Sequence, residues 1–568
     1  MGSEGEVATV ARVTVTAATA QARVPARQAK PLLGAWARRG LVIAGGVTTA
    51  LAFQPFNLWP LVALGVAALT VGVTGTRART AAGLGYLYGL SFLAVSIGWV
   101  YVIAVPVAVV LVAFESLWFL GLALALRLVV RVPWWPPIAA GAWLLVEAAY
   151  SRFPFDGFGW VRLAFTAADA PINGLFPFVG AAGVSYLVAL ICQLAAWLVL
   201  TVLPGPGAPT GTLPSAPAAP LRSALVRRSA VASTVIVAIT AAGLAGRLYE
   251  PAPDASPAVN VGMVQGNVDG VGVEFLGRQR SVTNNHLSET VTLMAKAHAG
   301  VVPTPDFVLW PENSTDIDPT RDAETRAVVQ TAARTAGVPI LVGAVMEGPG
   351  PFERQTTSLW WDPDRGVTDS YSKRNLVPFG EWIPFRRQLL PLIPMLQMVG
   401  AQGVPGIGPG VLTADIPAHG VTRVGVLICF ELAYDDTVRE MLVGDATTGG
   451  GAQLVTVQSN NATYAGTGQI SQQFAITRIR AMESRREILV ATTNALSGYV
   501  LADGTVVYET RQRTSASTAV AMPVRSALTP AVRYGRWVEW LLIAGSLGGL
   551  ALAVGAGRRP GPAPSRRP

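Results

Sequence analysis

Charged side chains are scarce in this sequence. Asp, Glu, Lys and Arg together make up 14% of its 568 residues, against about 25% in a typical soluble protein. Hydrophobic residues make up 51%. The deficit of charge excludes an ordinary soluble globular protein and indicates a membrane protein that also has a sizeable water-exposed part. The length allows for about two to four domains.

Cysteine and histidine are also rare, with two and three copies respectively. Cys192 and Cys429 lie far apart, and Cys192 lies in an apolar run, so the pattern does not indicate a disulfide framework. Neither residue type shows the spacing of metal ligands, and the sequence therefore predicts no metal site and no cofactor. The net charge of +9 does not predict a nucleic-acid partner, because the arginines cluster beside apolar segments.

Eight apolar segments approach the ~20 residues that an α-helix needs to cross a bilayer. They are residues 40–56, 58–75, 81–103, 105–126, 137–150, 180–203, 229–247 and 537–556. Alternate connections carry arginine clusters, which are Arg38 and Arg39, Arg77 and Arg79, Arg127 and Arg131, Arg222, Arg227 and Arg228, and Arg558 and Arg559. Because basic connections stay on the cytoplasmic side, this alternation predicts eight spans with both termini in the cytoplasm. Residues 248–536 are then extracytoplasmic.

The sequence accordingly divides into five parts. They are a cytoplasmic N-terminal tail (1–35), a seven-span transmembrane domain (36–247), an extracytoplasmic domain (248–530), a C-terminal transmembrane helix (531–557) and a cytoplasmic tail (558–568). Within the transmembrane domain, residues 204–220 read PGPGAPTGTLPSAPAAP. This composition cannot pack a core and predicts a flexible linker.

The extracytoplasmic segment is rich in short β-branched runs. Strands are predicted at Val259–Gln265, Phe307–Trp310, Ile340–Met346, Thr356–Trp361, Thr422–Cys429, Leu454–Gln458 and Ile488–Thr493. Asp503-Gly504 predicts a hairpin turn, and helical patterns cover Arg321–Ala336 and Gln469–Arg486. Strands that alternate with helices over this length predict an α/β or αββα layered domain.

Three strand ends in this segment carry reactive side chains. Glu312 follows Phe307–Trp310, Lys373 follows Tyr371-Ser372, and Cys429 ends its own strand. Taken singly, each side chain more often has a structural role, as a capping carboxylate, a solvated lysine or a small core residue. Together they supply the groups that nucleophilic catalysis by a thiol requires.

The thiol of Cys429 needs help to become a nucleophile. With a pKa of about 8.5, a free thiol is mostly protonated at neutral pH. Glu312 is a candidate base if a low-dielectric pocket raises its pKa, and Lys373 is a candidate to stabilise the thiolate and then the oxyanion of a tetrahedral intermediate. Sequence spacing alone does not bring the three together.

The motifs around these residues resemble the nitrilase, or carbon–nitrogen hydrolase, superfamily, and within it the membrane-bound apolipoprotein N-acyltransferase family. The similar stretches include Ala52–Pro60 (AFQPFNLWP), Trp143–Glu147 (WLLVE), Trp310–Glu312 (WPE), Leu376–Glu381 (LVPFGE) and Ile428–Glu431 (ICFE). The resemblance implies a polytopic α-helical membrane domain of about eight spans and an extracytoplasmic αββα nitrilase-like sandwich that carries the catalytic site.

The resemblance also implies roles for individual residues. Glu312 would be the general base, Lys373 the electrostatic and oxyanion helper, and Cys429 the nucleophile. The supporting residues that it implies are Glu381, Phe430 and Glu431. The first of these carboxylates would orient the lysine or the attacking amine, and the backbone amides after the cysteine would help to bind the oxyanion.

The activity that the resemblance implies is the N-acylation of lipoproteins in the bacterial plasma (inner) membrane by a multi-pass enzyme. Cys429 would take an acyl group from a phospholipid donor as a thioester. The free α-amine of the diacylglyceryl-cysteine of an apolipoprotein would then accept it as an amide. The implied partners are the phospholipid, the diacylated apolipoprotein and the bilayer.

Two other functions stay open on the residues alone. A membrane-anchored, nitrilase-type amidase would pass its acyl group to water. A non-catalytic lipid-binding scaffold would have lost at least one of Glu312, Lys373 and Cys429, and all three are present. Eight spans are excessive for a hydrolase of soluble substrates, which favours acyl transfer between lipids.

Two positions depart from the family pattern. Phe430 stands where many relatives have Tyr, so this protein does not require a hydroxyl there. Residues 460–464 read Asn-Asn-Ala-Thr-Tyr where relatives commonly read Asn-Asp-Ala-Trp-Phe, which bears on the acyl-chain or acceptor pocket.

One carboxylate in a predicted span calls for a partner, because charge inside a membrane is costly. Glu147 falls in a family-like motif, close in sequence to Arg152 and Arg162. We expect it to make a structural polar contact with one of these arginines.

Overall fold

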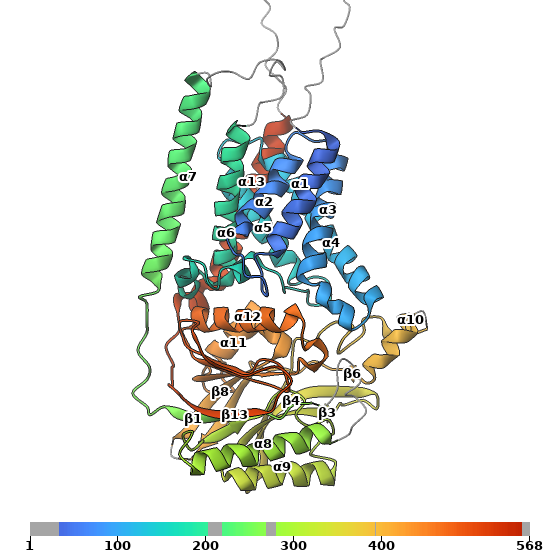
Figure 1. Cartoon of the computed structure of the whole chain (residues 1–568), viewed down its shortest axis with the longest axis vertical. Coiled ribbons are helices and arrows are strands. Elements are labelled where there is room, and N and C mark those ends of the chain that lie inside the picture. The colour runs from blue at the N-terminus through green and yellow to red at the C-terminus, as the bar shows by residue number, and fades with distance from the viewer. Residues whose placement is uncertain (1–32, 203–218, 269–279, 392, 418, 559–568) are drawn as a thin grey trace, which may run out of the picture.

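The computed structural model describes residues 33–202, 219–268, 280–391, 393–417 and 419–558 (Figure 1). The predicted tails, 1–35 and 558–568, and the predicted linker, 204–220, lie almost entirely outside these residues. A bundle of helices stands at one end of the molecule, and a domain of strands and helices lies at the other (Figure 1).

Each predicted apolar segment overlaps one helix of the described chain. These helices are α1 (Ala35–Ala50), α2 (Leu61–Val73), α3 (Ala78–Ser96), α4 (Val105–Val129), α5 (Trp135–Tyr150), α6 (Phe176–Val202), α7 (Ala219–Gly246) and α13 (Pro530–Arg558). Four of them, α4, α6, α7 and α13, are long and apolar enough to cross a membrane, whereas α2 is apolar but shorter. The count of eight spans stays a prediction.

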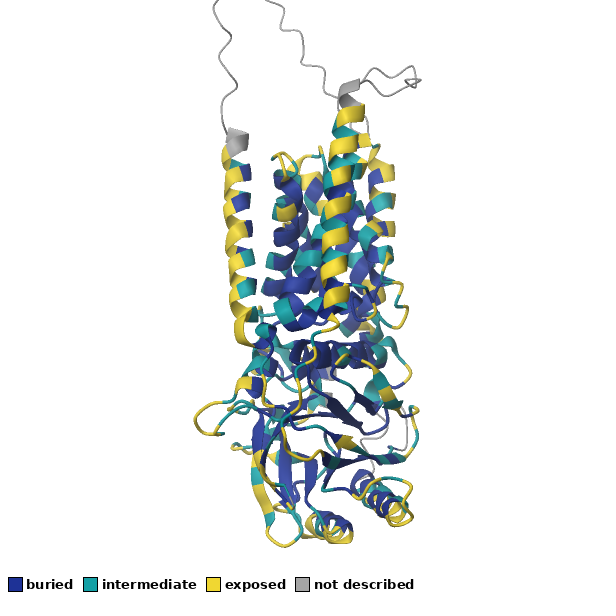
Figure 2. Cartoon of the chain, turned by 90° about the vertical axis from the view of Figure 1, so that its left-hand side faces the viewer, coloured by how far each residue is buried: buried dark blue, intermediate teal, exposed yellow. Residues whose placement is uncertain are grey.

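Helix α7 differs from its prediction in both length and setting. It begins ten residues before the predicted span 229–247, because Ala, Leu and Arg at its start are good helix formers. It packs on α6 but stands apart from the rest of the bundle (Figure 1), and Figure 2 shows it exposed along most of its length. Its exposed side chains include Val226, Val237 and Leu244, as expected for a helix whose outer face is covered by lipid.

The second domain is built on two β-sheets. The first has the strand order β13-β1-β2-β3-β4-β5, with β6 paired to β4, and the second has the order β12-β11-β10-β9-β8-β7. The first sheet's strands are β1 (Val259–Gln265), β2 (Phe307–Leu309), β3 (Ile340–Glu347), β4 (Glu353–Asp362), β5 (Gly366–Ser372), β6 (Gln402–Gly403) and β13 (Ala516–Met522). Those of the second are β7 (Val411–Ile416), β8 (Gly420–Ile428), β9 (Leu454–Ser459), β10 (Ile488–Thr492), β11 (Gly498–Val500) and β12 (Val506–Glu509).

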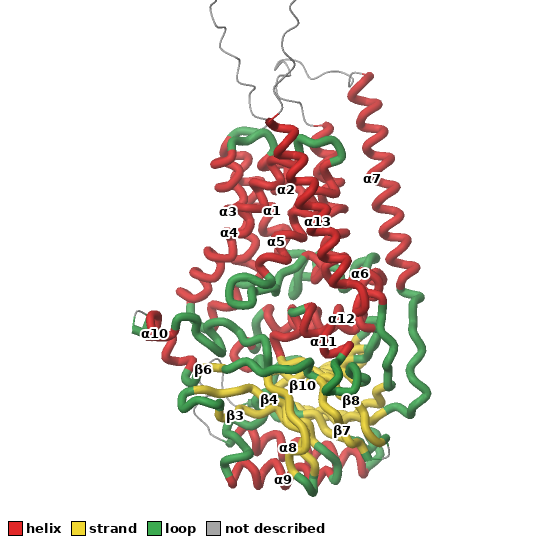
Figure 3. The backbone as a smooth tube through the Cα atoms, turned by 180° about the vertical axis from the view of Figure 1, so that it is seen from behind, coloured by secondary structure: helices red, strands yellow, loops and turns green. Residues whose placement is uncertain are grey.

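Helices cover the outer face of each sheet, which gives the predicted αββα order of layers (Figures 1 and 3). α8 (Ser281–His298) and α9 (Ala323–Ala336) lie on the first sheet, whereas α11 (Asp435–Val443) and α12 (Gly468–Ser484) lie between the second sheet and the helical bundle. A short helix, α10 (Arg386–Leu389), projects from the side. α9 begins where the Asp322 side chain accepts a hydrogen bond from Thr325 N, and it ends at Gly337 in a left-handed conformation.

The strand sequences explain this layering. β1, β2 and β3 run parallel, as do β8, β9 and β10. Such strands are buried on both faces and are therefore mostly apolar. Every residue of β9 is buried, its polar side chains included. Side chains from both sheets, among them Phe307, Trp360 and Ile428, form the core between them.

The helical bundle and the sandwich share one continuous core, because α12 is buried on all sides. The Gln472 side chain on this helix makes four hydrogen bonds to the bundle. Its Oε1 accepts from the indole N–H groups of Trp99 and Trp160, each at 2.9 Å, and its Nε2 donates to the backbone oxygens of Gln54 at 2.9 Å and Ser96 at 2.8 Å. The two halves are therefore fixed to each other by specific polar contacts.

Candidate active site

The strand ends that carry the three predicted reactive residues converge. Glu312 follows β2 and Lys373 follows β5, both in the first sheet, and Cys429 follows β8 in the second. Lys373 Nζ lies 2.9 Å from Glu312 Oε1. The charges of both residues shift the pKa of Cys429, so the thiol lies within their electrostatic reach. The structure thus brings together three residues that are more than 50 positions apart in sequence.

Glu312 is held in place by backbone and side-chain donors. Its Oε1 accepts from Lys373 Nζ and its Oε2 from Asn460 N at 2.7 Å. A Cβ added at Gly343 would lie 2.2 Å from Pro311 O, so glycine in β3 lets the segment before Glu312 pass closely. Burial raises the pKa of Glu312, although the positive charge of Lys373 opposes this shift. A carboxylate with a raised pKa is suited to accept a proton near neutral pH.

Lys373 is 1% exposed and lies between two carboxylates. Its Nζ donates to Glu312 Oε1 and to Glu381 Oε1, both at 2.9 Å. The other oxygen of Glu381 accepts from Val377 N at 2.8 Å, which fixes the carboxylate within its own loop. Burial alone lowers the pKa of Lys373, but the negative charges outweigh it and hold that pKa well above its usual range. An ammonium group has three N–H donors, so one is left for a substrate oxygen.

Cys429 stands at a sharp turn between β8 and a 3-10 turn, η6 (Cys429–Ala433), and has a φ of 53°. Few side chains adopt this left-handed conformation, and it commonly marks functional positions. Burial raises the pKa of the Cys429 thiol to about 12; the charge of Glu312 adds to this shift and that of Lys373 reduces it. A thiol with so high a pKa is neutral at neutral pH and would need a base to act as a nucleophile.

Glu431 joins the strand end before Lys373 to the strand end before Cys429. It is fully buried, and its Oε1 accepts from Tyr371 OH and Arg374 N, both at 2.7 Å. Its Oε2 accepts from Ile428 N at 2.8 Å. These three bonds tie β5 to β8 across the two sheets. The carboxylate of Glu431 thus acts as a positioning group, since its oxygens are occupied by structural donors.

Phe430 lies against the loop that follows α5 in the helical bundle. Its ring stacks on Phe158 at a centroid distance of 5.8 Å and on Trp160 at 5.7 Å. Close to the thiol, Tyr464 contacts Trp99 edge to face, with ring centroids 5.2 Å apart. Aromatic side chains from both domains therefore surround the turn that presents Cys429, and an apolar chain would find favourable contacts there.

A network of buried polar side chains lies next to Cys429. No function for it was predicted from the sequence. Gln473 Oε1 accepts from Asn461 Nδ2 at 2.7 Å and from Gln469 Nε2 at 2.8 Å, and it lies 3.9 Å from Cys429 Sγ. Gln473 Nε2 donates to Ser459 Oγ at 2.7 Å. The one available signal was Asn461, which departs from the family pattern. The amide at this position donates to its glutamine neighbours, which a carboxylate cannot do.

Glu147 finds one of its two predicted partners. Its Oε2 lies 3.9 Å from Arg162 Nε, and its Oε1 accepts from Leu163 N at 2.8 Å. Arg152 instead forms a double hydrogen bond with Glu539 of α13, at 3.0 and 2.6 Å. The expected structural contact is thus made with Arg162. Within the described ranges, no group of three His, Cys, Asp or Glu side chains is placed to hold a metal ion.

Comparisons with known proteins divide the chain at the same point as the structure. Residues 45–194 match the family model of the apolipoprotein N-acyltransferase N-terminal domain, and residues 261–522 match that of the carbon–nitrogen hydrolases. The chain is similar to the apolipoprotein N-acyltransferase of Mycolicibacterium smegmatis, with 33% identity over 94% of this chain and 88% of the relative. Similar proteins of the same description occur in Azotobacter vinelandii (27% identity, 93% and 98% covered) and Vibrio parahaemolyticus (24%, 88% and 94%).

Proposed function

The chain belongs to the apolipoprotein N-acyltransferase family, and from this premise we propose the donor, the intermediate and the residues of its reaction. It is an acyltransferase of the carbon–nitrogen hydrolase superfamily. We propose that Cys429 takes a fatty acyl group from a membrane phospholipid and that the α-amine of a diacylated apolipoprotein receives it. The convergence of Glu312, Lys373 and Cys429 is the observation that carries this proposal.

The first half-reaction forms a thioester. Glu312 removes the proton of the thiol as Cys429 Sγ attacks the ester carbonyl of the phospholipid. The tetrahedral oxyanion receives the remaining N–H of Lys373 and the backbone N–H groups at the start of η6, which the helical turn itself does not use. The C–O bond then breaks, and Glu312 returns the proton to the departing alkoxide. The products are a lysophospholipid and an acylated Cys429.

The second half-reaction uses the same groups in the same roles, with Cys429 now as the leaving group. The neutral α-amine of the diacylglyceryl-cysteine attacks the thioester carbonyl, and Glu312 takes a proton from the amine nitrogen. The oxyanion is again stabilised by Lys373. The C–S bond breaks, and the thiolate of Cys429 recovers its proton from Glu312. The products are an amide on the apolipoprotein and the free thiol.

We place the sandwich domain outside the cytoplasm, with the helical bundle crossing the plasma membrane in eight spans. The arginine clusters on alternate connections support this orientation, and the four long apolar helices support the embedding. Phe430, Phe158 and Trp160 line the side of the site that faces the bundle. Lipid substrates would thus reach Cys429 along the membrane surface, and the same aromatic wall would keep water from the thioester.

The proposal is tested with full-length protein, a phospholipid with a labelled acyl chain and a synthetic diacylated lipopeptide. We expect N-acylated peptide from wild type and none from Cys429→Ala. Cys192→Ala provides the matched control, because Cys192 is buried in the helical bundle and should be dispensable. Labelled free fatty acid in place of N-acylated peptide would identify water as the acceptor and refute the proposed acyl transfer.

A further inference from the structure

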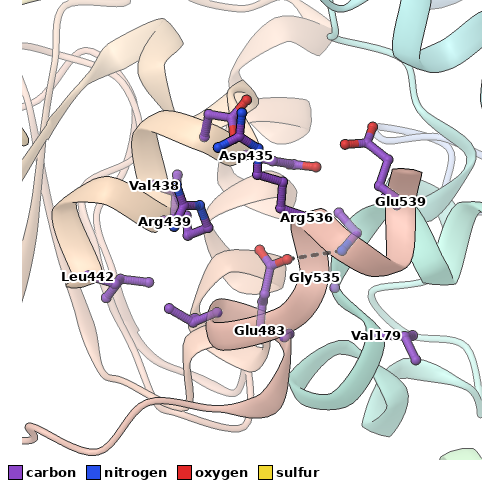
Figure 4. A pocket seen from close by; sticks show the side chains of 15 residues that line it. Val179, Asp435, Val438, Arg439, Leu442, Glu483, Gly535, Arg536 and Glu539 are labelled. Atoms are coloured by element: carbon purple, nitrogen blue, oxygen red, sulfur yellow. Dashed lines mark hydrogen bonds between the residues drawn. The ribbon is translucent and has the colours of Figure 1, made fainter. Parts of the chain in front are cut away.

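A cavity lies where the helical bundle meets the sandwich, and Cys429 is not among its lining residues. It is a small hollow of about 40 Å³ that opens to solvent, and its walls come from α6, α11, α12 and α13 (Figure 4). Its lining residues are Val179, Gly180, Ala181, Ala182, Asp435, Asp436, Val438, Arg439, Leu442, Glu483, Ala531, Val532, Gly535, Arg536 and Glu539. Neither Cys429 nor its candidate partners are among them.

The acidic side chains of this cavity are matched by arginines. Asp435 lies 2.7 Å from both Arg162 and Arg480, and Glu483 lies 2.5 Å from Arg480. In the same way, Arg152 lies 2.6 Å from Glu539 and 4.0 Å from Asp436. The carboxylates are therefore largely compensated within the protein.

Two arginines of the cavity have no such carboxylate partner within the described ranges. Among the described residues, neither Arg439 nor Arg536 has a carboxylate within 4.0 Å. The Nε atom of Arg439 is buried and has no hydrogen-bond partner, which is unusual for a buried donor. Both arginines line the same hollow (Figure 4). Arg536 is exposed to solvent, whereas Arg439 Nε is not. A ligand with an oxyanion could pair with both guanidinium groups, because these bind phosphate through paired N–H donors.

The position of the cavity along the apolar helices α6 and α13 indicates that such a ligand comes from the membrane. α6 and α13 are both long and apolar enough to cross a membrane, and the cavity lies at their ends nearest the sandwich (Figure 1). The same turns of α13 expose Tyr534, Trp537 and Trp540. Exposed Tyr and Trp side chains are typical of the level of lipid headgroups. Apolar side chains such as Val179 and Val532 line the hollow beside the arginines, as an amphiphile requires.

We propose that this cavity binds the phosphate of a membrane phospholipid that is not the acyl donor bound at Cys429. Arg439 and Arg536 hold the phosphate, and the apolar wall of α6 and α13 receives the glycerol end of the acyl chains. The bound lipid adds a further link between the bundle and the sandwich, besides the contacts that their side chains make directly. This site rests on the proposed membrane embedding and is independent of the acyl-transfer chemistry.

The test measures lipid binding by the full-length chain in detergent, with Cys429→Ala present throughout to prevent turnover. Native mass spectrometry follows titration with phosphatidylglycerol, with a diacylglycerol of the same chains, and with inorganic phosphate. We expect phosphatidylglycerol to bind, and the double change Arg439→Gln and Arg536→Gln to weaken this binding by about tenfold or more, since two charge-assisted contacts are lost. Diacylglycerol should bind no better to the unchanged chain than to the double variant.

Arg533→Gln is the matched control, because Arg533 is an exposed arginine of the same helix that does not line the cavity. Arg439→Lys with Arg536→Lys retains both charges and should keep part of the affinity. Equal binding of phosphatidylglycerol to the unchanged chain and the Gln variant would overturn the proposal. Saturation by inorganic phosphate without any affinity for phosphatidylglycerol would show an anion site that is not a lipid site. Acyl transfer, measured with Cys429 intact, tests the proposed function separately.

Discussion

Replacing Glu312 by Gln should have opposite effects on two reactions of Cys429. Acyl transfer should fall sharply, because the amide cannot accept the thiol proton. Alkylation of the thiol by iodoacetamide should become faster, because the negative charge of Glu312 raises the pKa of Cys429. A residue that acts only as structural support would slow both reactions together.

The magnitude follows from the charges beside the thiol. Glu312 and Glu381 carry one negative charge each and Lys373 one positive charge, so the net local charge is −2 + 1 = −1. With the pKa of Cys429 at about 12, only a very small fraction of the thiol is ionised at pH 7.5. The substitution brings the local charge to zero. A fall of about one pKa unit raises the thiolate fraction, and with it the alkylation rate, about tenfold.

The assay compares iodoacetamide labelling and lipopeptide acylation at pH 7.5 in matched detergent samples. Glu381→Gln makes the same change in charge but keeps Glu312, so it should also speed labelling and lose less acyl transfer. Lys373→Met removes the cation and should slow labelling. The unfolding temperature of each variant checks its fold. Slower labelling of Glu312→Gln than of wild type would refute this reasoning, because it would mean that Glu312 already ionises the thiol at rest.

Three further predictions concern the surroundings of the site. Because burial raises the pKa of Glu312, the base becomes protonated as the pH falls, and the pH–rate profile of acyl transfer should have its acidic limb above the ordinary glutamate value of about 4.3; a limb at that value would contradict the assignment. Asn461→Asp removes the donors to Gln469 and Gln473 and should lower both the unfolding temperature and the acylation rate, whereas unchanged values would exclude a positioning role. Gln472→Leu removes four hydrogen bonds to the bundle and should destabilise the chain by about 2–4 kcal/mol in denaturant titrations.

Much of the sandwich could be predicted because its central strands have strong local patterns. β1 was predicted with its observed bounds, Val259–Gln265, since an apolar β-branched run indicates a strand buried on both faces. The strand ends also located Glu312, Lys373 and Cys429. Their convergence could come only from the resemblance to a known family, because it depends on two sheets that pack face to face.

Several peripheral elements escaped prediction in whole or in part. Only the end of β5 (Gly366–Ser372), just before Lys373, was predicted, because the rest of this strand is largely exposed and has little apolar signal. α8 and α11 were also not predicted, and α11 is only nine residues long. The position of α12 between the sandwich and the helical bundle could not be predicted for another reason. Its glutamines are typical of a solvated helix, yet Gln469, Gln472 and Gln473 are buried by the neighbouring domain, which no local pattern in the helix records.

The roles of the supporting residues depended on the structure in the same way. Glu431 follows the nucleophile in sequence, but its oxygens accept from Tyr371, Arg374 and Ile428. It therefore joins two strand ends rather than facing a substrate. Such a role depends on pairing across the sheets and leaves no trace in the residues that flank it.

The thioester intermediate proposed at Cys429 is tested most directly by looking for the acyl group on that residue. Full-length protein is incubated with phospholipid in the absence of lipopeptide, and the intact mass and a protease digest are recorded. We expect a mass gain of one acyl chain on the peptide that contains Cys429, its removal by neutral hydroxylamine, and its transfer to lipopeptide added later. Acyl transfer that proceeds in Cys429→Ala, or an acyl group that accumulates on another residue, would contradict this proposal.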